Sequence, residues 1–117
     1  MSDVRDPPRL LLVEDDPVSR SFFGDALADL PAVVDAARDI AEALRLASAN
    51  RHALWLIDAH LPDGDGSDCL RSLRLLHEVP ALAITAGASR EELDGLCSSG
   101  FIEVLLKPVS IALLQAT

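Results

Sequence analysis

The sequence has 117 residues, of which 50% are hydrophobic and 25% are charged, and this balance suits one globular domain rather than a disordered chain. Its net charge of −9 repels nucleic acid and anionic lipid, so we expect no direct nucleic-acid binding. Residues 1–9 lack the apolar core of a signal peptide, and no apolar run approaches the length of a membrane span. Cys69 and Cys97 have no metal-site spacing, so we expect a cytoplasmic protein with both cysteines in its core.

Strand and helix signals alternate along the first half of the chain. Leu10–Val13 is a short apolar run that predicts a buried strand, and Asp16 before Pro17 predicts the N-cap and first residue of a helix. A weak strand is predicted at Ala32–Val34, and Asp39 is the expected N-cap of a second helix. We expect the inner faces of the two helices to carry Val18, Phe22, Ala26 and Leu30 in the first, and Ile40, Leu44 and Ala47 in the second.

The middle of the chain contains the strongest predicted strand, Ala53–Ile57, which Asp58 follows directly. The next segment is rich in Pro, Gly and Asp and predicts a loop, after which a third helix begins at Ser67 or Asp68. A fourth strand is predicted at Ala81–Thr85. The expected inner face of the third helix consists of Leu70, Leu73 and Leu76.

The last third of the chain opens with "SREE" at Ser89–Glu92, a capping box that predicts a helix ending near Gly100. We expect Leu93, Leu96 and Cys97 to face inward from this helix. Phe101–Leu106 predicts a fifth strand, and Ser110 is the expected N-cap of a last helix. That helix is only about seven residues long, which is marginal on its own. We therefore expect residues 1–117 to be one domain cut from a longer protein.

This alternation of apolar strands and helices predicts an open, doubly wound α/β fold with a parallel sheet covered on both faces. In such folds the functional site lies at the carboxyl ends of the strands. The polar residues that the sequence places at these ends are Glu14, Asp15, Asp16, Asp58, Thr85 and Lys107. We expect them to meet at one edge of the sheet.

Carboxylates that converge in this way require a cation, and oxygen ligands favour Mg²⁺ or a related hard ion. We expect Asp16 to cap its helix, which leaves Glu14 and Asp15 for the metal. Asp58 could then act as a nucleophile on phosphorus, forming an aspartyl phosphate. Lys107, the only lysine, and the Thr85 hydroxyl could contact the phosphoryl group. Capping, turn formation, β-propensity and solvation could explain each residue separately, but not their shared position.

Four motifs, "LLLVEDDP", "LIDAHLPDGDG", "AITA" and "LLKP", occur in an order that resembles the receiver domain of bacterial two-component response regulators. The resemblance implies a flavodoxin-like five-stranded sheet with strand order 2-1-3-4-5. It also implies that Asp58 is the phosphoacceptor and that Thr85 and Lys107 bind the phosphoryl group. The implied Mg²⁺ ligands are Glu14, Asp15, Asp58 and the carbonyl of His60. The peptide bond before Pro108 is implied to be cis.

By the same resemblance, the phosphoryl donor is a histidine kinase or a histidine phosphotransfer protein, and the response controls an output domain or a downstream protein. We therefore expect a signalling domain rather than an enzyme. Two alternatives are a haloacid-dehalogenase-like phosphatase, which requires Asp where this chain has His60, and a module that only binds partners. The chain departs from the family at Val104, where Tyr or Phe is usual, and at Val109, where Phe is frequent. We therefore expect a small response to phosphorylation, centred on Ala86–Ser89.

Overall fold

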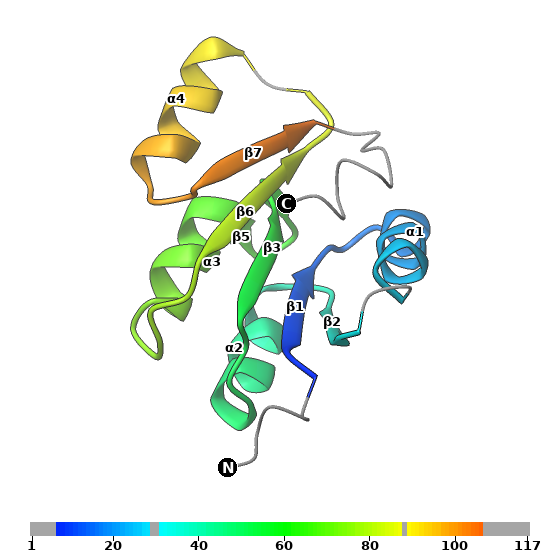
Figure 1. Ribbon diagram of the computed structural model, residues 1–117. Coiled ribbons are helices and arrows are strands. Elements are labelled where there is room, and N and C mark those ends of the chain that lie inside the picture. Colours follow the sequence, from blue (N-terminus) through cyan, green and yellow to red (C-terminus); the bar gives the residue numbers. More distant parts are fainter. Residues whose placement is uncertain (1–6, 29–30, 88, 107–117) are drawn as a thin grey trace.

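The computed structural model describes residues 7–28, 31–87 and 89–106. Its main sheet has five strands in the order β2-β1-β3-β6-β7, and every neighbouring pair is parallel (Figure 1). The strands are β1 (Arg9–Val13), β2 (Val33–Ala37), β3 (Leu54–Asp58), β6 (Ala81–Thr85) and β7 (Glu103–Leu106). Numbered among themselves, these strands have the predicted order 2-1-3-4-5, so the doubly wound flavodoxin-like fold is confirmed.

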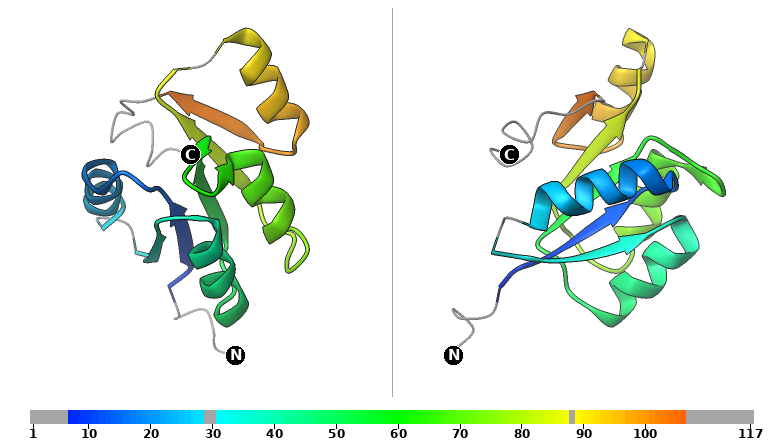
Figure 2. Two further views of the ribbon diagram at one scale, coloured as in Figure 1. Left: turned by 180° about the vertical axis from the view of Figure 1, so that it is seen from behind. Right: turned by 90° about the vertical axis from the view of Figure 1, so that its right-hand side faces the viewer.

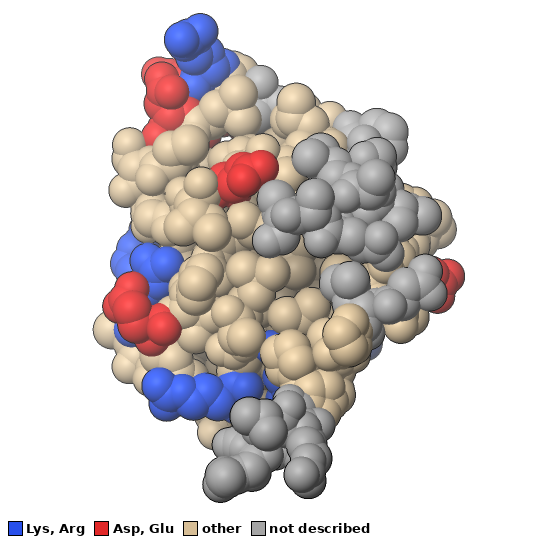
Figure 3. All heavy atoms as spheres, in the orientation of Figure 1, with Lys and Arg blue, Asp and Glu red and all other residues tan. Residues whose placement is uncertain are grey.

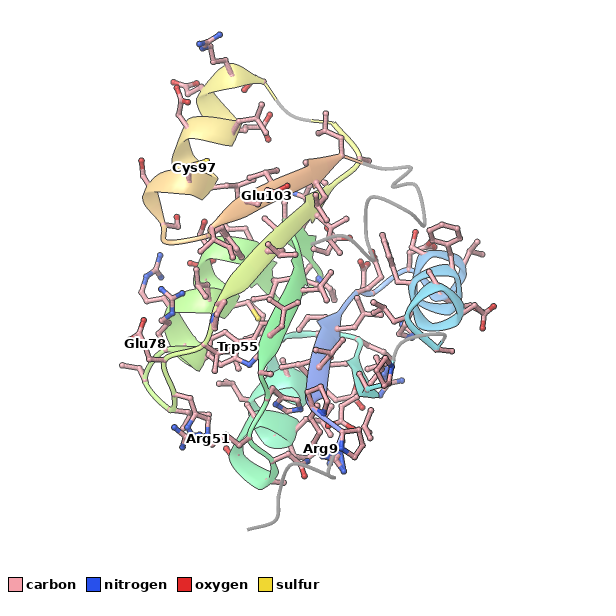
Figure 4. All side chains as sticks on the ribbon, viewed as in Figure 1. Arg9, Arg51, Trp55, Glu78, Cys97 and Glu103 are labelled. Carbon is pink, nitrogen blue, oxygen red and sulfur yellow. The ribbon has the colours of Figure 1, made fainter. Side chains whose placement is uncertain are left out.

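Helices lie on both faces of this sheet (Figures 1 and 2). They are α1 (Pro17–Ala28), α2 (Ile40–Ala49), α3 (Gly66–Leu73) and α4 (Arg90–Ser98). On one face, Phe23 and Leu27 of α1 pack in a core cluster with Leu12 and Leu56. On the other face, residues of α2, α3 and α4 pack around the fully buried Trp55, which is labelled in Figure 4. The strands are apolar on both sides because both sides are covered.

Three of the predicted helix caps, those formed by Asp16, Asp39 and Ser89, are present in the structure, and the predicted cap at Ser110 lies outside the described residues. The Ser19 amide donates to Asp16 Oδ2 over 2.8 Å, and the Glu42 amide donates to Asp39 Oδ1 over 2.8 Å. The capping box at the start of α4 is also confirmed, because Ser89 and Glu92 exchange both of its hydrogen bonds. Each cap satisfies amide groups that the first turn of a helix leaves without an intrahelical partner.

The predicted inner face of α1 is wrong in part. Val18 is 76% exposed and Phe22 is 40% exposed, whereas the buried residues of this helix are Phe23, Ala26 and Leu27. Four-residue steps advance about 40° per step beyond a full turn, so a line drawn through them drifts off the buried face. The predicted contribution of Leu30 lies outside the described residues.

The predicted loop after Asp58 contains a short antiparallel hairpin formed by β4 (His60–Leu61) and β5 (Gly64–Asp65). Asp65 is the N-cap of α3, which begins at Gly66 and not at Ser67 or Asp68. The helix ends at Leu73, so Leu76 lies beyond it and is exposed rather than inward-facing. The segment after Asp58 therefore contains paired strands and leads directly into α3.

Several other predictions on the elements need correction. The exposed Cys97 lies on the outside of α4, and only Cys69 is in the core as predicted (Figure 4). Strand β2 extends to Ala37, β3 includes Asp58, and β7 begins at Glu103.

The predictions for Lys107, the following cis peptide, Val109 and the last helix lie outside the described residues. In the parts of the chain that the structure describes, no helix is long and apolar enough to cross a membrane.

Candidate functional site

Three carboxylates meet at the carboxyl edge of the sheet. Glu14 and Asp15 directly follow β1, and Asp58 is the last residue of β3, the strand beside it. One carboxylate oxygen from each of the three residues lies within 4.8 Å of those of the other two. The structure therefore confirms that the residues predicted from two distant segments of the chain lie together.

The three carboxylates differ in their exposure to solvent. Glu14 is fully buried and Asp58 is 6% exposed, whereas Asp15 is exposed to solvent. Like charges at this separation repel one another, and the repulsion is strongest where water is excluded. A cation that enters from the solvent side, past Asp15, would reduce this repulsion. The donor atoms are all carboxylate oxygens, the set that Mg²⁺ prefers, so the residues fit a magnesium site.

Backbone hydrogen bonds hold the loop that contains Glu14 and Asp15. The Glu14 amide continues the sheet by donating to Ala37 O over 2.9 Å, and the Asp16 amide donates to Glu14 Oε2 over 3.2 Å. The Asp16 carboxylate caps α1, as predicted, by accepting the Ser19 amide. Asp16 is thus occupied by the helix, and the two acidic residues that precede it, Glu14 and Asp15, belong to the cluster.

A second set of backbone contacts holds the segment around Asp58. The His60 amide donates to Asp58 Oδ1 over 2.8 Å, which fixes the orientation of this carboxylate. The Ala59 amide donates to Ile84 O over 2.7 Å, which ties the segment to β6. The His60 side chain is largely exposed, with Nε2 4.0 Å from Glu92 Oε2. Its imidazole is not part of the acidic cluster, and the predicted metal ligand is its backbone carbonyl.

Gly66 is a residue of this site that sequence reasoning missed. Its amide donates to Ala59 O over 2.8 Å. A Cβ atom at this position would lie 2.8 Å from Asp58 O and 3.0 Å from Ala59 Cα. Only glycine therefore fits without a shift of the backbone beside the predicted phosphoacceptor. The available signal was the second glycine of "DGDG", a segment whose composition indicated only a turn.

Thr85 ends β6, the strand next to the one that carries Asp58, and it is fully buried. Its hydroxyl donates to Gly87 O over 3.2 Å. The residue lines a cleft of about 310 Å³ that also has Ala59, His60 and Glu92 in its wall. Hydrogen bonds from the Ser89 amide and hydroxyl hold the pKa of Glu92 below its usual range, and the charge of His60 adds a smaller effect.

Figure 3 shows how charged side chains are distributed over one face of the described surface. On the face shown in Figure 3, charged side chains lie singly or in small groups, mostly along one margin, and the described residues form no continuous basic patch there. Such a patch is the usual footprint of nucleic-acid binding. The predicted phosphate-binding cation, Lys107, lies outside the described residues.

Comparisons with known proteins agree with this site. The sensor histidine kinase RcsC of Salmonella typhimurium is 32% identical over 117 residues, which are 99% of this chain and 12% of that protein. The transcriptional regulatory protein HprR of Escherichia coli is 32% identical over 108 residues, 92% of this chain and 48% of that protein. This chain thus spans only a minor part of these relatives.

A crystal structure of the receiver domain of a sensor histidine kinase from Pseudomonas aeruginosa has a TM-score of 0.84 and 32% identity, and the match covers 94% of this chain and 93% of that one. That domain has a magnesium ion coordinated in its active-site cleft. The family model of the response regulator receiver domain matches residues 10–117. This chain therefore belongs to the response regulator receiver domain family, the phosphoacceptor domains of two-component signalling.

Proposed function

We propose that Asp58 is the residue that accepts the phosphoryl group. The observation that carries this proposal is the convergence of the Glu14, Asp15 and Asp58 carboxylates at one edge of the sheet. Of the three, Asp58 is both buried at the end of a central strand and oriented by the His60 amide. A nucleophile that is already held in one direction loses little freedom when it reacts.

In the proposed reaction, a carboxylate oxygen of Asp58 forms a bond to phosphorus while the bond between phosphorus and the donor imidazole nitrogen breaks. The imidazole keeps the electron pair of the broken bond. The phosphoryl oxygens would then lie near the ends of β6 and β7, where Thr85 offers a hydroxyl and Lys107 an ammonium group. Because the protein is itself the acceptor, we propose that it acts as a signalling domain and not as an enzyme with turnover.

We further propose that the site binds Mg²⁺ through the carboxylates of Glu14, Asp15 and Asp58 and the carbonyl of His60. The oxygen-only donor set and the 4.8 Å cluster support this assignment. When bound, the ion would neutralise charge that develops on the transferred group. The chain's own contribution is to hold two of the carboxylates out of solvent and to keep the third at the entrance.

We propose that the phosphoryl donor is a histidine kinase or a histidine phosphotransfer protein, and that α1 is part of the surface it contacts. Val18 and Phe22, about one turn apart on this helix, leave apolar surface exposed on the element that begins two residues after Asp15. We also propose that residues 1–117 form the receiver unit of a longer cytoplasmic regulator, in which an output domain or a downstream protein reads the phosphorylated state. The small share of each relative that this chain spans supports this view.

The experiment that tests this function is phosphorylation by acetyl phosphate in the presence of Mg²⁺, followed by intact-mass measurement. The wild-type protein should gain one phosphoryl group, and Asp58→Asn should gain none. Asp25→Asn, the same change at an exposed position of α1, is the matched control and should behave as wild type. Equal incorporation in Asp58→Asn and wild type would refute the assignment of Asp58.

The same experiment separates the proposal from the alternative of a module that only binds partners, because such a module would gain no phosphoryl group even as wild type. The phosphatase alternative is not retained, since the chain belongs to the receiver family. His60 also stands where that alternative requires an aspartate.

A further inference from the structure

We propose that Arg20 is a positioning residue for the metal-binding loop, an inference that rests on the proposed function of Glu14 and Asp15. Arg20 lies in α1 and is half-buried. Its Nη1 atom donates to the carbonyl oxygen of Glu14 over 2.9 Å and to that of Asp15 over 3.2 Å. One nitrogen of a helical side chain thus holds two consecutive carbonyl groups of the loop.

These two carbonyl groups belong to the two peptide planes that flank the Cα atom of Asp15. Each peptide is planar, so the direction of its carbonyl sets the orientation of the whole plane. Two fixed planes determine φ and ψ of Asp15, and these angles determine where its Cβ atom points. Arg20 therefore controls the direction of the Asp15 side chain without touching its carboxylate.

The Asp15 carboxylate depends on backbone positioning more than the other two carboxylates of the cluster do. The Asp58 carboxylate accepts a hydrogen bond from the His60 amide, and that of Glu14 accepts one from the Asp16 amide. The Asp15 carboxylate is exposed, and in the described part of the chain no group donates a hydrogen bond to it. Its place in the cluster thus depends on the backbone, and a metal site loses affinity when its ligands are not held in position.

Arg20 also has a positive charge, and this property predicts the opposite effect on metal binding. If charge alone mattered, removal of Arg20 would reduce repulsion of the incoming Mg²⁺ and strengthen its binding. If Arg20 positions Asp15, its removal should weaken binding in spite of the lost charge. The sign of the change in Mg²⁺ affinity therefore distinguishes the charge effect from the positioning effect. A third possibility, a purely structural role of Arg20, would lower the stability of the fold without weakening metal binding.

The test is calorimetric titration of Mg²⁺ into wild type, Arg20→Gln and Arg20→Lys, with thermal unfolding of each metal-free protein. We expect Arg20→Gln to raise the Mg²⁺ dissociation constant by about 10-fold or more, the usual effect of removing a residue that orients a metal ligand. Arg20→Lys should fall between wild type and Arg20→Gln, because the lysine ammonium keeps the charge and can still donate to carbonyl groups, but its flexible, strongly hydrated stem is less pre-organised than the planar guanidinium. Arg45→Gln, the same change at an exposed position of α2 on the opposite face of the sheet, should bind Mg²⁺ as wild type does.

Unchanged or tighter Mg²⁺ binding by Arg20→Gln, with wild type binding normally, would overturn this inference and leave the proposed function intact. If wild type itself binds no Mg²⁺, the proposed metal site fails, and the role of Arg20 fails with it. Should Arg20→Gln not fold, Arg20→Lys decides the question, since Mg²⁺ affinity equal to that of wild type would refute a role that depends on the pre-organised guanidinium.

Discussion

Replacing Gly66 with alanine should destabilise the protein and disturb the phosphoacceptor, because the new methyl group has no room. It would lie 2.8 Å from the carbonyl oxygen of Asp58, and backbone atoms cannot rotate away as a flexible side chain can. Either α3 or the segment after β3 must therefore shift. Forcing an extra methyl group into a packed site costs about 1–3 kcal/mol of folding free energy.

The chain offers matched controls for this substitution. Gly24 in α1 and Gly95 in α4 are also helical glycines, and an added Cβ atom at either position meets no atom within 4 Å. Alanine at these positions should stabilise the protein by up to about 1 kcal/mol, the helix propensity of alanine over glycine. Gly66→Ala should therefore be less stable than either control variant by about 1–4 kcal/mol.

Chemical denaturation followed by tryptophan fluorescence can measure this difference. Trp55 is the only tryptophan and is fully buried, so its emission reports on the unfolding of the core. In thermal unfolding, the difference corresponds to roughly 4 °C for each kcal/mol in a domain of this size. Acetyl phosphate should also phosphorylate Gly66→Ala more slowly than Gly24→Ala, because the Asp58 backbone is displaced. If the Gly66→Ala protein is as stable and as reactive as the two control variants, the close-contact argument is refuted.

Three further predictions concern the metal, the response and the thiols. Asp15→Asn should weaken Mg²⁺ binding and raise the melting temperature of the metal-free protein, because it removes one of three mutually repelling carboxylates; unchanged affinity in a titration, together with a lower melting temperature, would contradict this. Beryllofluoride, a phosphoryl mimic, should shift amide resonances mainly beside Thr85 and at the start of α4, because Val104 is short and stiff in a strand, and Val104→Tyr should enlarge the response; large shifts throughout β7 of the wild type would argue against this. Burial raises the pKa of the Cys69 thiol to about 12, so Cys69 should resist alkylation at mildly alkaline pH while the exposed Cys97 reacts. Stability should also fall as pH rises between about 9 and about 12, since the unfolded chain loses the thiol proton first, and Cys69→Ala should remove this part of the fall.

Local signals in the sequence were sufficient for the architecture and for the acidic site. The apolar runs that became β1, β3 and β6 are short and continuous, which is the pattern of a strand covered on both faces. Residues that directly follow parallel strands must meet at one edge of the sheet, so Asp15 and Asp58 could be placed together across 43 positions of sequence. Caps such as Asp39 were also predictable, because a cap acts within its own helix turn.

Boundaries and helix faces were less predictable, because they depend on what packs against each element. Val18 and Phe22 have the same apolar character as the buried Phe23, and only the position of α1 on the sheet decides which of them faces inward. Cys97 is exposed for the same reason, since the angle of α4 directs Leu96 toward the core instead.

Other contacts between distant segments, away from the carboxyl ends of the strands, were decided by the tertiary structure alone. Asp63 accepts the amides of Ile40 and Ala41 and so adds a second cap to α2 from the hairpin segment. His52 is buried, with Nε2 2.8 Å from Asp35 Oδ2, far from the acidic site. No periodicity or motif indicates such pairs, because each depends on the relative placement of two elements.

Gly66 and Arg20 are residues of the site itself whose roles could not be predicted from the sequence. The sequence identifies the side chains that can perform the chemistry, since charge and hydrogen-bonding groups are properties of the residue. It does not identify the groups that hold those side chains in place, because these act through distances to backbone atoms. A Cβ atom added to Gly66 would lie 2.8 Å from Asp58 O, and Arg20 Nη1 lies 2.9 Å from Glu14 O. Such distances exist only after α1 and α3 have packed against the sheet, so the tertiary structure alone decides which residues support the acidic cluster.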